Sequence, residues 1–570
     1  MGGLAGWIAT PRRMRDERAL IPMLEAIAHR CTGDSAMCAM VDRGARHEVV
    51  LGARLHDPVA GLSIALDGSI ENRRELHAQL AGLGYRFAGE SAPEVVLRAY
   101  QRWDKDMVKH LRGPFAIALW DARKEQLLLA RDRFGEKPLF VRESGGALFF
   151  ASEIKALLRA PEVPPQVDLA GVRDCLAQGF VSGPGTLLAG VRKLAPATCA
   201  LWQLGRLHEV RYWLAPDRDR RLPGQATADE ASAVDGFIAC LGEALALQRE
   251  SADGLFLSGG LDSAVLAALA VRQGGRLKTF SLGWEGDRRS ELAAAAQAAK
   301  HFGTEHHEIV VSARELATAL PRVVALRGAP LARPSDLAFH RLAAEASPRA
   351  RGVLTGEGCD EVLGGYRRHA AGRFAWSLSG YRDRPGPALR DALCTLEAPG
   401  ASRAGRPPFD ADPRASRLRR ILYFEQTGRL PDDLLERGDR IGMAASLELR
   451  SPYLDHRLAE LVSGYPDRLR VRGMTTKWVL RQAGRRLLPP ALQRRPKRGF
   501  RLPLAGWLRT ELSEMVREHL SGSASLTRRY YDAALLDRVV DEHLRARKNH
   551  EHLLWTLLNL EIWHRTRAGG

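Results

Sequence analysis

The chain of 570 residues is poor in cysteine and has no long apolar stretch. Its seven cysteines are scattered and odd in number, without a Cys-x-x-Cys pair or any other metal-ligand spacing. Such cysteines are expected to be buried thiols in a reducing cytosol. No apolar run approaches the ~18 residues that a membrane span needs, and residues 1–14 lack the apolar core of a signal peptide. We therefore expect a cytoplasmic protein without a membrane span.

Aromatic residues make up only 6% of the chain, whereas the net charge is +18. Nucleic-acid-binding surfaces concentrate Lys and Arg together with aromatic residues, but here arginine is spread through every segment. We attribute the charge to an arginine-rich composition and expect no nucleic-acid partner. Apolar residues, at 45%, are sufficient for two large cores.

A glycine-rich junction at 258–263, Ser-Gly-Gly-Leu-Asp-Ser, separates an apolar strand (254–257) from an apolar helix predicted over 264–271. The glycines let backbone N–H groups close on phosphate oxygens, and the helix N-terminus adds positive potential. A carboxylate at Asp262 suits this site when Mg²⁺ lies between it and a polyphosphate. The junction lacks the lysine of a Walker A loop and resembles the PP-loop of ATP pyrophosphatases, which cleave between the α and β phosphates. A plain Gly-Ser turn is the alternative.

A second polar strand end, Thr355-Gly-Glu-Gly-Cys-Asp-Glu361, follows a strand predicted over 352–354. By itself it could be a solvated acidic turn. Ligands of an open α/β sheet gather at the carboxyl ends of its strands, so we expect Asp360 to join Asp262 around one Mg²⁺–pyrophosphate. Lys477 lies in the first turn of an amphipathic helix predicted over 474–481, and it could neutralise charge on the α-phosphate as pyrophosphate leaves. A lysine on a helix surface is the alternative.

These motifs resemble, in order, the synthetase domain of class B asparagine synthetases, and other segments resemble the glutamine amidotransferase domain that precedes it. The segments are 257–263, 279–283, 301–308, 356–366, 439–456 and 495–500 for the first resemblance, and 111–121, 131–139 and 150–155 for the second. The resemblance implies an α+β, Ntn-hydrolase-like β-sandwich domain followed by an α/β PP-loop ATP pyrophosphatase domain. It also implies ATP and Mg²⁺ as cofactors.

Sequence patterns place the domain limits. Alternating strands up to residue 213 end a β-rich first domain (1–214), and a polar, proline-containing stretch opens a linker (215–232). Helical stretches around a few strands then predict a parallel sheet wrapped by helices (233–570). An insertion rich in Pro, Gly, Ala and Arg, at 382–414, is either a lid over the substrate or a disordered loop.

The resemblance also implies roles for particular residues. A substrate carboxylate attacks the α-phosphorus of ATP, pyrophosphate leaves, and an amine attacks the acyl-adenylate. Asp262 and Asp360 are expected to bind Mg²⁺, and Lys477 to act during adenylation. Glu357 is the expected base for the amine, although it lies close enough to Asp360 to organise Mg²⁺ instead. The residues expected around ATP are Leu257, Ser258, Gly259, Gly260, Asp262, Ser263, Leu282, Thr355 and Gly356.

The chain departs from the family at its start. The family opens Met-Cys-Gly-Ile, and the cysteine becomes the N-terminal nucleophile, whereas residue 2 here is glycine, which cannot attack an amide. The family's glutamine-binding pattern is also changed, at Asp67, Ser69 and Ala92. The sequence therefore predicts an inactive glutaminase domain.

Without a glutaminase, the amine must be free ammonia, part of a small substrate, or a peptide N-terminus. Relatives without the cysteine include β-lactam synthetases and lasso-peptide cyclases. β-Lactam-forming relatives have tyrosine where this chain has Glu357. In addition, residues 328–335 lack the acidic residues of the asparagine-forming pattern and contain Arg333.

We therefore expect an ATP-dependent carbon–nitrogen ligase of lasso-peptide biosynthesis, which forms a macrolactam between a peptide's N-terminal amine and an Asp or Glu side chain. Its expected partners are a precursor peptide and a leader protease. Ammonia-dependent or β-lactam-like small-molecule amide synthesis is the alternative within the family. A nucleotide-binding pseudoenzyme scaffold is the alternative from another class, but Ser258, Asp262, Asp360 and Lys477 are all retained.

Overall fold

A computed structural model describes residues 2–9, 17–30, 38–43, 48–53, 55–57, 60–203, 205–219, 229–286, 291–372, 412–493, 502–523 and 525–568. Most of the predicted insertion at 382–414, and the segment 495–500, lie outside the described residues. The chain divides into two compact units. Unit 1 comprises Met1–Asp168, Gly183–Ala215 and Gln426–Asp439, and unit 2 comprises Leu169–Ser182, Pro216–Glu425 and Arg440–Gly570.

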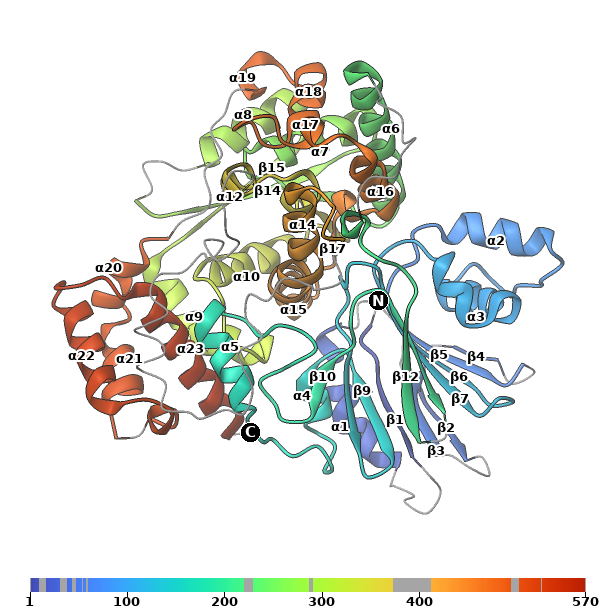
Figure 1. The fold of residues 1–570 in the computed structure, drawn as a ribbon, viewed down its shortest axis with the longest axis horizontal. Coiled ribbons are helices and arrows are strands. Elements are labelled where there is room, and N and C mark those ends of the chain that lie inside the picture. The colour runs from blue at the N-terminus through green and yellow to red at the C-terminus, as the bar shows by residue number, and fades with distance from the viewer. Residues whose placement is uncertain are drawn as a thin grey trace. The chain divides into compact units, whose positions relative to one another are not determined.

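Unit 1 is a sandwich of two antiparallel, six-stranded sheets (Figure 1). One sheet has the order β10-β8-β9-β1-β3-β2 and the other β12-β11-β7-β6-β5-β4. The strands of the first are β1 Ala5–Ala9, β2 Cys38–Arg43, β3 Glu48–Ala53, β8 Phe140–Ser144, β9 Ala147–Ala151 and β10 Val191–Lys193. Those of the second are β4 Leu55–Asp57, β5 Leu62–Gly68, β6 Phe115–Asp121, β7 Gln126–Arg131, β11 Thr198–Gln203 and β12 Arg206–Arg211.

The second sheet of unit 1 is buried on both faces, which explains its apolar sequence. On one face Trp120 and Leu129 pack with Ile8 and Phe150 of the first sheet. The other face packs against α2 (Arg73–Gly82) and α3 (Ala92–Trp103). Strand β6 is consequently apolar at nearly every position instead of alternating. The predicted β-sandwich is confirmed. The short helices α1 (Leu20–Glu25) and α4 (Ile154–Leu157) complete the unit.

Unit 2 is built on a five-stranded parallel sheet of order β15-β14-β13-β16-β17. Its strands are β13 Gly254–Phe256, β14 Lys278–Trp284, β15 Glu305–Val311, β16 Val353–Leu354 and β17 Leu449–Arg450. Helices α7 (Leu261–Arg272), α8 (Leu292–Phe302), α9 (Ala313–Arg327) and α10 (Ser335–Ala346) connect the first four strands. Because these helices return the chain to the amino edge, the carboxyl ends of the strands share one edge. The predicted α/β domain is confirmed.

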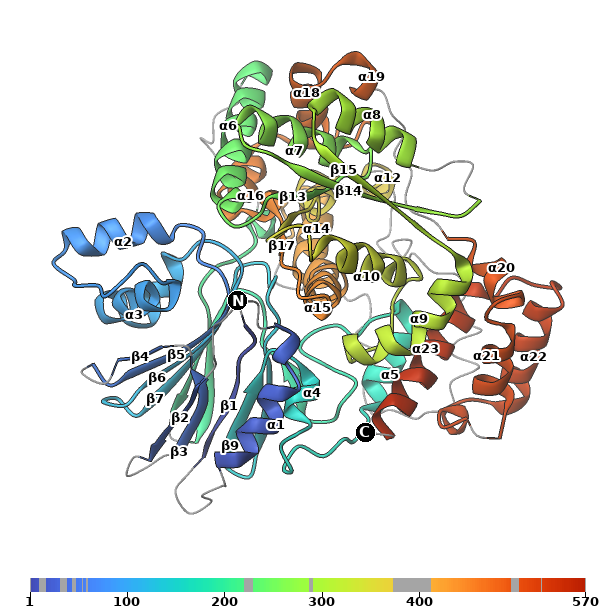
Figure 2. The same cartoon turned by 180° about the vertical axis from the view of Figure 1, so that it is seen from behind.

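Further helices complete unit 2, and Figure 2 shows them from behind. They are α5 Leu169–Gln178, α6 Glu230–Arg249, α11 Cys359–Leu363, α12 Arg367–Gly372, α14 Arg417–Phe424, α15 Glu436–Ala444, α16 His456–Gly464, α17 Asp467–Arg470, α18 Trp478–Leu487, α19 Pro490–Gln493, α20 Leu504–Arg509, α21 Ser513–Val516, α22 Ala533–Leu544 and α23 Glu551–Ala568. None of the described helices combines the length and hydrophobicity needed to cross a bilayer.

Two helix starts differ from the sequence expectation. Helix α7 begins at Leu261, so Asp262 and Ser263 lie in its first turn and not in the preceding loop. The helix expected from residue 474 begins at Trp478, because Arg472 and Thr475 exchange backbone hydrogen bonds of 2.9 Å and close a tight turn. Lys477 is the residue before this helix and has a left-handed backbone, with φ of 52°.

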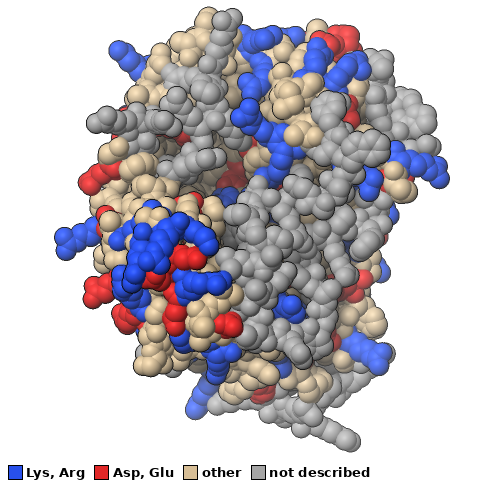
Figure 3. All heavy atoms as spheres, turned by 60° about the vertical axis from the view of Figure 1, so that its left-hand side comes forward, with Lys and Arg blue, Asp and Glu red and all other residues tan. Residues whose placement is uncertain are grey.

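Lys and Arg side chains mingle with Asp and Glu on the described part of the face drawn in Figure 3. The absence of a nucleic-acid partner stays a prediction.

Candidate active site

The site begins where β13 leaves the sheet. The Leu257 amide donates to the Phe280 carbonyl on β14 (2.9 Å), whereas Ser258 is already exposed. Gly259 then turns the chain with φ of +69°, and a Cβ there would lie 2.7 Å from the Ala294 Cβ. Glycine is therefore required both for the backbone angle and for the close approach.

The glycine-rich loop closes on the first turn of α7. The Ser258 amide donates to Ser263 Oγ (3.2 Å), and Ser263 Oγ donates to the Gly260 carbonyl (3.3 Å). The N-terminus of α7 presents backbone N–H groups and a positive dipole end, which are the features that helix N-termini offer to anions. Phosphate binding by this loop stays a prediction from the sequence motif.

Lys477 meets both acidic residues that the sequence assigned to the metal. Its Nζ lies 2.6 Å from Asp262 Oδ2 and 2.7 Å from Asp360 Oδ1. Burial alone would lower the pKa of Lys477, but the negative charges around it raise that pKa well above its ordinary value. The lysine is therefore a buried, permanent cation between two carboxylates.

A glycine-rich turn holds this cluster together. Gly365 donates its amide to the Asp360 carbonyl (2.8 Å). A Cβ at Gly365 would lie 1.8 Å from Asp360 Oδ1 and 2.0 Å from Lys477 Cε. The Gly-Gly-Tyr sequence after the acidic strand end thus leaves room for the ion pair.

Strand β16 brings the second motif against the first. The Thr355 amide donates to the Arg450 carbonyl of β17 (2.7 Å), and a Cβ at Gly356 would lie 3.3 Å from the Asp262 Cβ. The Glu357 amide approaches Thr355 Oγ1 at 3.4 Å, and the Glu357 side chain is half-buried on this turn. Leu282, also half-buried, lies on the neighbouring β14 strand.

Two buried side chains, Cys359 and Tyr453, lie next to the ion cluster. The sequence motifs assigned neither of them a role. Burial raises the pKa of the Cys359 thiol well above its ordinary value, so the thiol is neutral. Tyr453 donates its hydroxyl to the Asp262 carbonyl (2.9 Å), and burial also raises its pKa. Both residues lie in segments that carried the family resemblance, which is the only signal that pointed to them.

A second acidic group lies behind Asp360. Burial, followed by the charges of Asp360 and Glu425, raises the pKa of Glu361 to about 7. The Tyr366 hydroxyl donates to Glu361 Oε1 at 2.5 Å, and Arg368 pairs with Glu425 Oε1 at 2.8 Å. This cluster was also not predicted.

The donor set fits Mg²⁺ only when ATP supplies the remaining ligands. In the described part of the chain, no group of three or more His, Cys, Asp or Glu residues is arranged to hold a metal ion. Asp262 and Asp360 nevertheless converge on one point, marked by Lys477 Nζ. One or two carboxylates plus substrate phosphates is the usual protein environment of Mg²⁺.

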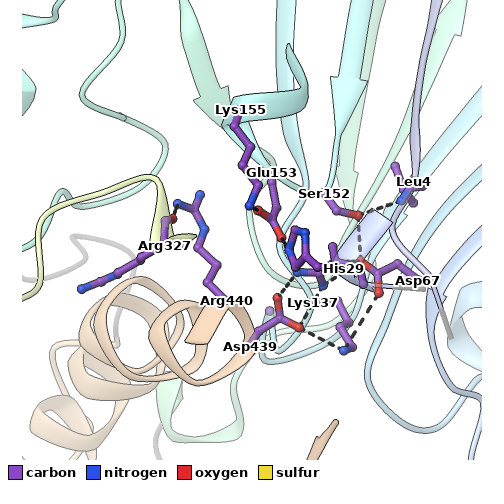
Figure 4. Close-up of polar contacts among 12 residues, drawn as sticks. Leu4, His29, Asp67, Lys137, Ser152, Glu153, Lys155, Arg327, Asp439 and Arg440 are labelled. Atoms are coloured by element: carbon purple, nitrogen blue, oxygen red, sulfur yellow. Dashed lines mark hydrogen bonds and ion pairs between the residues drawn. The ribbon is translucent and has the colours of Figure 1, made fainter. Parts of the chain in front are cut away.

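Near the N-terminus of unit 1, polar groups of the unit pair with one another (Figure 4). The Leu4 amide donates to Ser152 Oγ (3.0 Å), and Ser152 Oγ donates to Asp67 Oδ2 (2.7 Å). The same carboxylate oxygen pairs with Arg30 Nη2 at 2.9 Å. Asp67 is therefore an internal partner of a buried arginine.

The other two changed positions lie at the ends of secondary-structure elements: Ser69 follows β5, and Ala92 begins α3. The Ser69 amide donates to the Pro114 carbonyl (2.8 Å). Ala92 opens α3 behind Ser91, whose hydroxyl caps the helix by accepting from the Glu94 amide (3.3 Å).

Comparisons with known proteins agree with this geometry. Residues 240–565 match the asparagine synthase family, and residues 1–213 match the glutamine amidotransferase domain. A putative glutamine-hydrolysing asparagine synthetase of Mycobacterium bovis is 32% identical over 555 residues, covering 88% of this chain and 84% of the relative. The glutamine-hydrolysing asparagine synthetase 1 of Bacillus subtilis is 28% identical over 554 residues, covering 88% and 85%. An amidase of Gibberella zeae is 27% identical over 554 residues, covering 81% and 80%.

The family match spans more than half of the chain, and it coincides with the phosphate loop, the paired carboxylates and the buried lysine of unit 2. The family uses ATP. The chain therefore belongs to the asparagine synthase family and is an asparagine synthetase-like, ATP-dependent carbon–nitrogen ligase.

Proposed function

We propose that the chain forms an amide without taking ammonia from glutamine, and that its product is a macrolactam. In this reaction the N-terminal amine of a precursor peptide is joined to an Asp or Glu side chain, as in lasso-peptide cyclases. The observation that carries the proposal is the combination of Lys477 paired with both acidic residues and glycine at position 2.

In the first half-reaction, an oxygen of the substrate carboxylate attacks the α-phosphorus of ATP, and the bond to the bridging oxygen of pyrophosphate breaks. The loop at 258–263 offers serine hydroxyls and backbone N–H groups to the departing phosphates. Lys477 is buried in this cluster, so its charge acts in a medium with little screening by water. It balances the negative charge that develops as pyrophosphate leaves.

Asp262 and Asp360 would hold Mg²⁺ together with phosphate oxygens of ATP. The ion would supply Lewis-acid stabilisation of the pyrophosphate leaving group. Tyr453 and Gly365 keep these residues in place through hydrogen bonds to the Asp262 and Asp360 carbonyls.

In the second half-reaction, the amine nitrogen attacks the acyl carbon, and the bond from that carbon to the AMP oxygen breaks. The amine must lose a proton, and Glu357 is the proposed base. Its turn follows β16, so the carboxylate belongs to the same sheet edge as the adenylating residues.

The state of unit 1 supports an inactive glutaminase. Residue 2 has no side chain that could act as a nucleophile. Asp67 is held by Arg30 and Ser152, and both partners are buried. A free glutamine molecule would have to compete with these partners for the carboxylate.

Two features favour a peptide over a small substrate. Glu357 replaces the tyrosine of β-lactam-forming relatives, and the loop 328–335 lacks the acidic residues of the asparagine-forming pattern. The second candidate is asparagine formation from free ammonia. It is favoured by relatives at up to 32% identity that bear the name asparagine synthetase.

ATP–pyrophosphate exchange tests the proposal. The purified protein is offered a synthetic precursor peptide encoded beside its gene, or aspartate with ammonium, or aspartate with glutamine. We expect exchange, AMP and a peptide product lighter by one water only with the peptide. Asparagine formed from aspartate and ammonium would replace the macrolactam proposal. ATP binding without exchange under any condition would indicate a scaffold without catalysis.

A further inference from the structure

Unit 1 holds a segment that comes from far along the chain. Gln426–Asp439 belongs to unit 1, although the residues on both sides of it belong to unit 2. At its middle the segment is fixed by Asp432, which accepts from the Gly183 amide (2.6 Å) and from Lys193 Nζ (3.2 Å). Lys193 also pairs with Glu436 at 2.9 Å.

The last residue of the segment has the tightest attachment. Arg30 donates from Nη1 to Asp439 Oδ2 (2.8 Å) and from Nη2 to Asp439 Oδ1 (3.0 Å). Figure 4 shows Lys137 beside the same carboxylate, with Nζ 3.0 Å from Oδ1. The same guanidinium faces Asp67 and Glu153 at 2.9 and 3.1 Å, and it is fully buried. A two-point fork of this kind fixes the direction of a carboxylate as well as its position.

Asp439 precedes Arg440 in the same helix, α15, so fixing one residue orients the other. The Arg440 side chain is buried, and its Nη1 donates to the Arg327 carbonyl at 2.7 Å. That carbonyl belongs to the last turn of α9, which ends at Gly328 with φ of +66°. The helix end is a place where carbonyls lack partners within the helix, so Arg440 supplies a needed donor.

The loop 328–335 starts at this point and ends at α10. Arg327 of α9 also donates from Nη1 to the Pro330 carbonyl (2.8 Å). Helix α23 adds further contacts: Trp563 Nε1 donates to the Gly328 carbonyl (3.1 Å), and Trp555 Nε1 donates to the Leu331 carbonyl (2.9 Å). Helix α10 leads into the amino end of β16, so its own start lies at the carboxyl edge of the sheet, beside the candidate active site. The loop therefore borders the place where the carboxylate substrate is expected.

We propose that Arg30 and Asp439 are positioning residues for the substrate loop 328–335. Arg30 fixes Asp439, the helix α15 transmits that position to Arg440, and Arg440 holds the end of α9 from which the loop begins. The first domain would then serve the synthetase reaction without any glutaminase activity. The inference rests on the proposed function only in assigning the substrate to this loop.

If the ion network around Arg30 only stabilised the fold, a different experimental result would be expected. Buried ion pairs often contribute little net stability, because desolvation offsets the attraction between the charges. If the network only stabilised the fold, removal of any of its carboxylates would loosen the protein in the same way. If Arg30 and Asp439 position the loop, removal of the Asp439 carboxylate must loosen the loop 328–335, whereas removal of the Asp432 carboxylate must not. Asp432 lies in the same segment and has a similar buried partner.

Hydrogen–deuterium exchange of the full-length protein, followed by mass spectrometry, tests the first link. The variants are Arg30→Lys, which keeps the charge and removes the fork, Asp439→Asn, and Asp432→Asn as the matched control. We expect Arg30→Lys and Asp439→Asn to accelerate exchange in 328–335 by about threefold or more, because a loosened loop opens more often. Asp432→Asn should leave that loop unchanged and loosen residues 183–193.

Arg440→Met tests the last link, because it removes the donor to Arg327 and leaves the ion network intact. It should accelerate exchange in 328–335 like Asp439→Asn. In the pyrophosphate-exchange assay, Arg30→Lys and Arg440→Met should each raise the KM for the carboxylate substrate at least about fivefold, a loss of about 1 kcal/mol in binding, with the KM for ATP nearly unchanged.

Unchanged exchange in 328–335 for both Arg30→Lys and Arg440→Met would overturn the inference, as would an equal response to Asp432→Asn. A variant that fails to fold is recognised by its thermal unfolding curve, and Arg30→Lys, which keeps the charge balance, then decides the first link. Loop exchange is independent of the substrate's identity. Failure of the macrolactam proposal is therefore distinguishable from failure of this inference.

Discussion

At the scale of single residues, the chemistry of this protein is concentrated in one buried ion cluster. Lys477 Nζ lies within hydrogen-bonding distance of both Asp262 and Asp360, although 215 residues separate it from Asp262. The cluster pairs one cation with two carboxylates and so retains a negative charge, which suits a site that also takes up a divalent cation.

Asp262→Asn and Asp360→Asn should each abolish product formation while the fold persists. Removing one carboxylate leaves the charge of the Mg²⁺–pyrophosphate group uncompensated. The rates of product formation are compared with those of Asp253→Asn, which changes an aspartate at the opposite end of β13, where it accepts from the Arg351 amide. A loss smaller than about tenfold, or about 1.4 kcal/mol, in either site variant would show that the assigned ligand is wrong.

Single substitutions should affect the two half-reactions, adenylation and amide formation, differently. Lys477→Ala should remove adenylation and amide formation together, because its charge acts as pyrophosphate leaves. Glu357→Gln should slow amide formation while part of the adenylation persists, visible as AMP and pyrophosphate produced with hydrolysed substrate. Both half-reactions are measured for each variant. Equal loss of adenylation and ring closure in Glu357→Gln would assign Glu357 to the metal site.

At the scale of elements, the site depends on how strand ends meet helix starts. The loop 258–263 closes on the first turn of α7, and the turn after β16 packs against the same turn of α7 through Gly356 and Asp262. Glycines allow these close approaches, because a Cβ would occupy the space that a neighbouring atom needs.

Gly365→Ala tests this packing. The new Cβ would lie 1.8 Å from Asp360 Oδ1 and 2.0 Å from Lys477 Cε, so the ion pair must move. We expect at least a hundredfold loss of pyrophosphate exchange, or roughly 3 kcal/mol, with a native circular dichroism spectrum. Gly506→Ala in α20 is the control, because a Cβ there meets nothing within 4 Å and should leave activity unchanged. Wild-type activity in Gly365→Ala would contradict the geometry of the cluster.

At the scale of the whole molecule, unit 1 has a complete two-sheet fold, although residue 2 is glycine. Its two sheets enclose a continuous apolar core. Its buried charges hold the segment Gln426–Asp439. The positioning role proposed for Arg30 and Asp439 would give this unit a function that needs no nucleophile at residue 2.

Restoring the nucleophile should not restore glutaminase activity. In the Gly2→Cys variant, Asp67 stays paired with Arg30 and Ser152, so the glutamine pocket is still incomplete. We expect glutamate release from glutamine to stay at background in an enzyme-coupled assay. The glutamine-hydrolysing asparagine synthetase 1 of Bacillus subtilis serves as the positive control. Glutamate release above background by the wild-type chain or by Gly2→Cys would refute an inactive glutaminase.

Much of the fold was predictable because its signals are local. Apolar runs bounded by turns predicted the strands, and glycines beside serine or aspartate predicted the phosphate loop. The predicted start of α18, at residue 474, was wrong. The turn between Arg472 and Thr475 depends on backbone pairing that no residue pattern revealed. Tyr453 and Cys359 were missed because their importance lies in what they are buried against.

The sequence by itself determined the family, the two fold classes and the glycine at position 2, since each depends on the identity or order of residues. Only the tertiary structure decided that Lys477 contacts both acidic residues, that Asp67 pairs with Arg30, and that Gln426–Asp439 folds with the first unit. These are long-range pairings of buried charges. Their partners are selected by packing and by the cost of leaving a charge unpaired away from water, and neither can be read from residues taken in order.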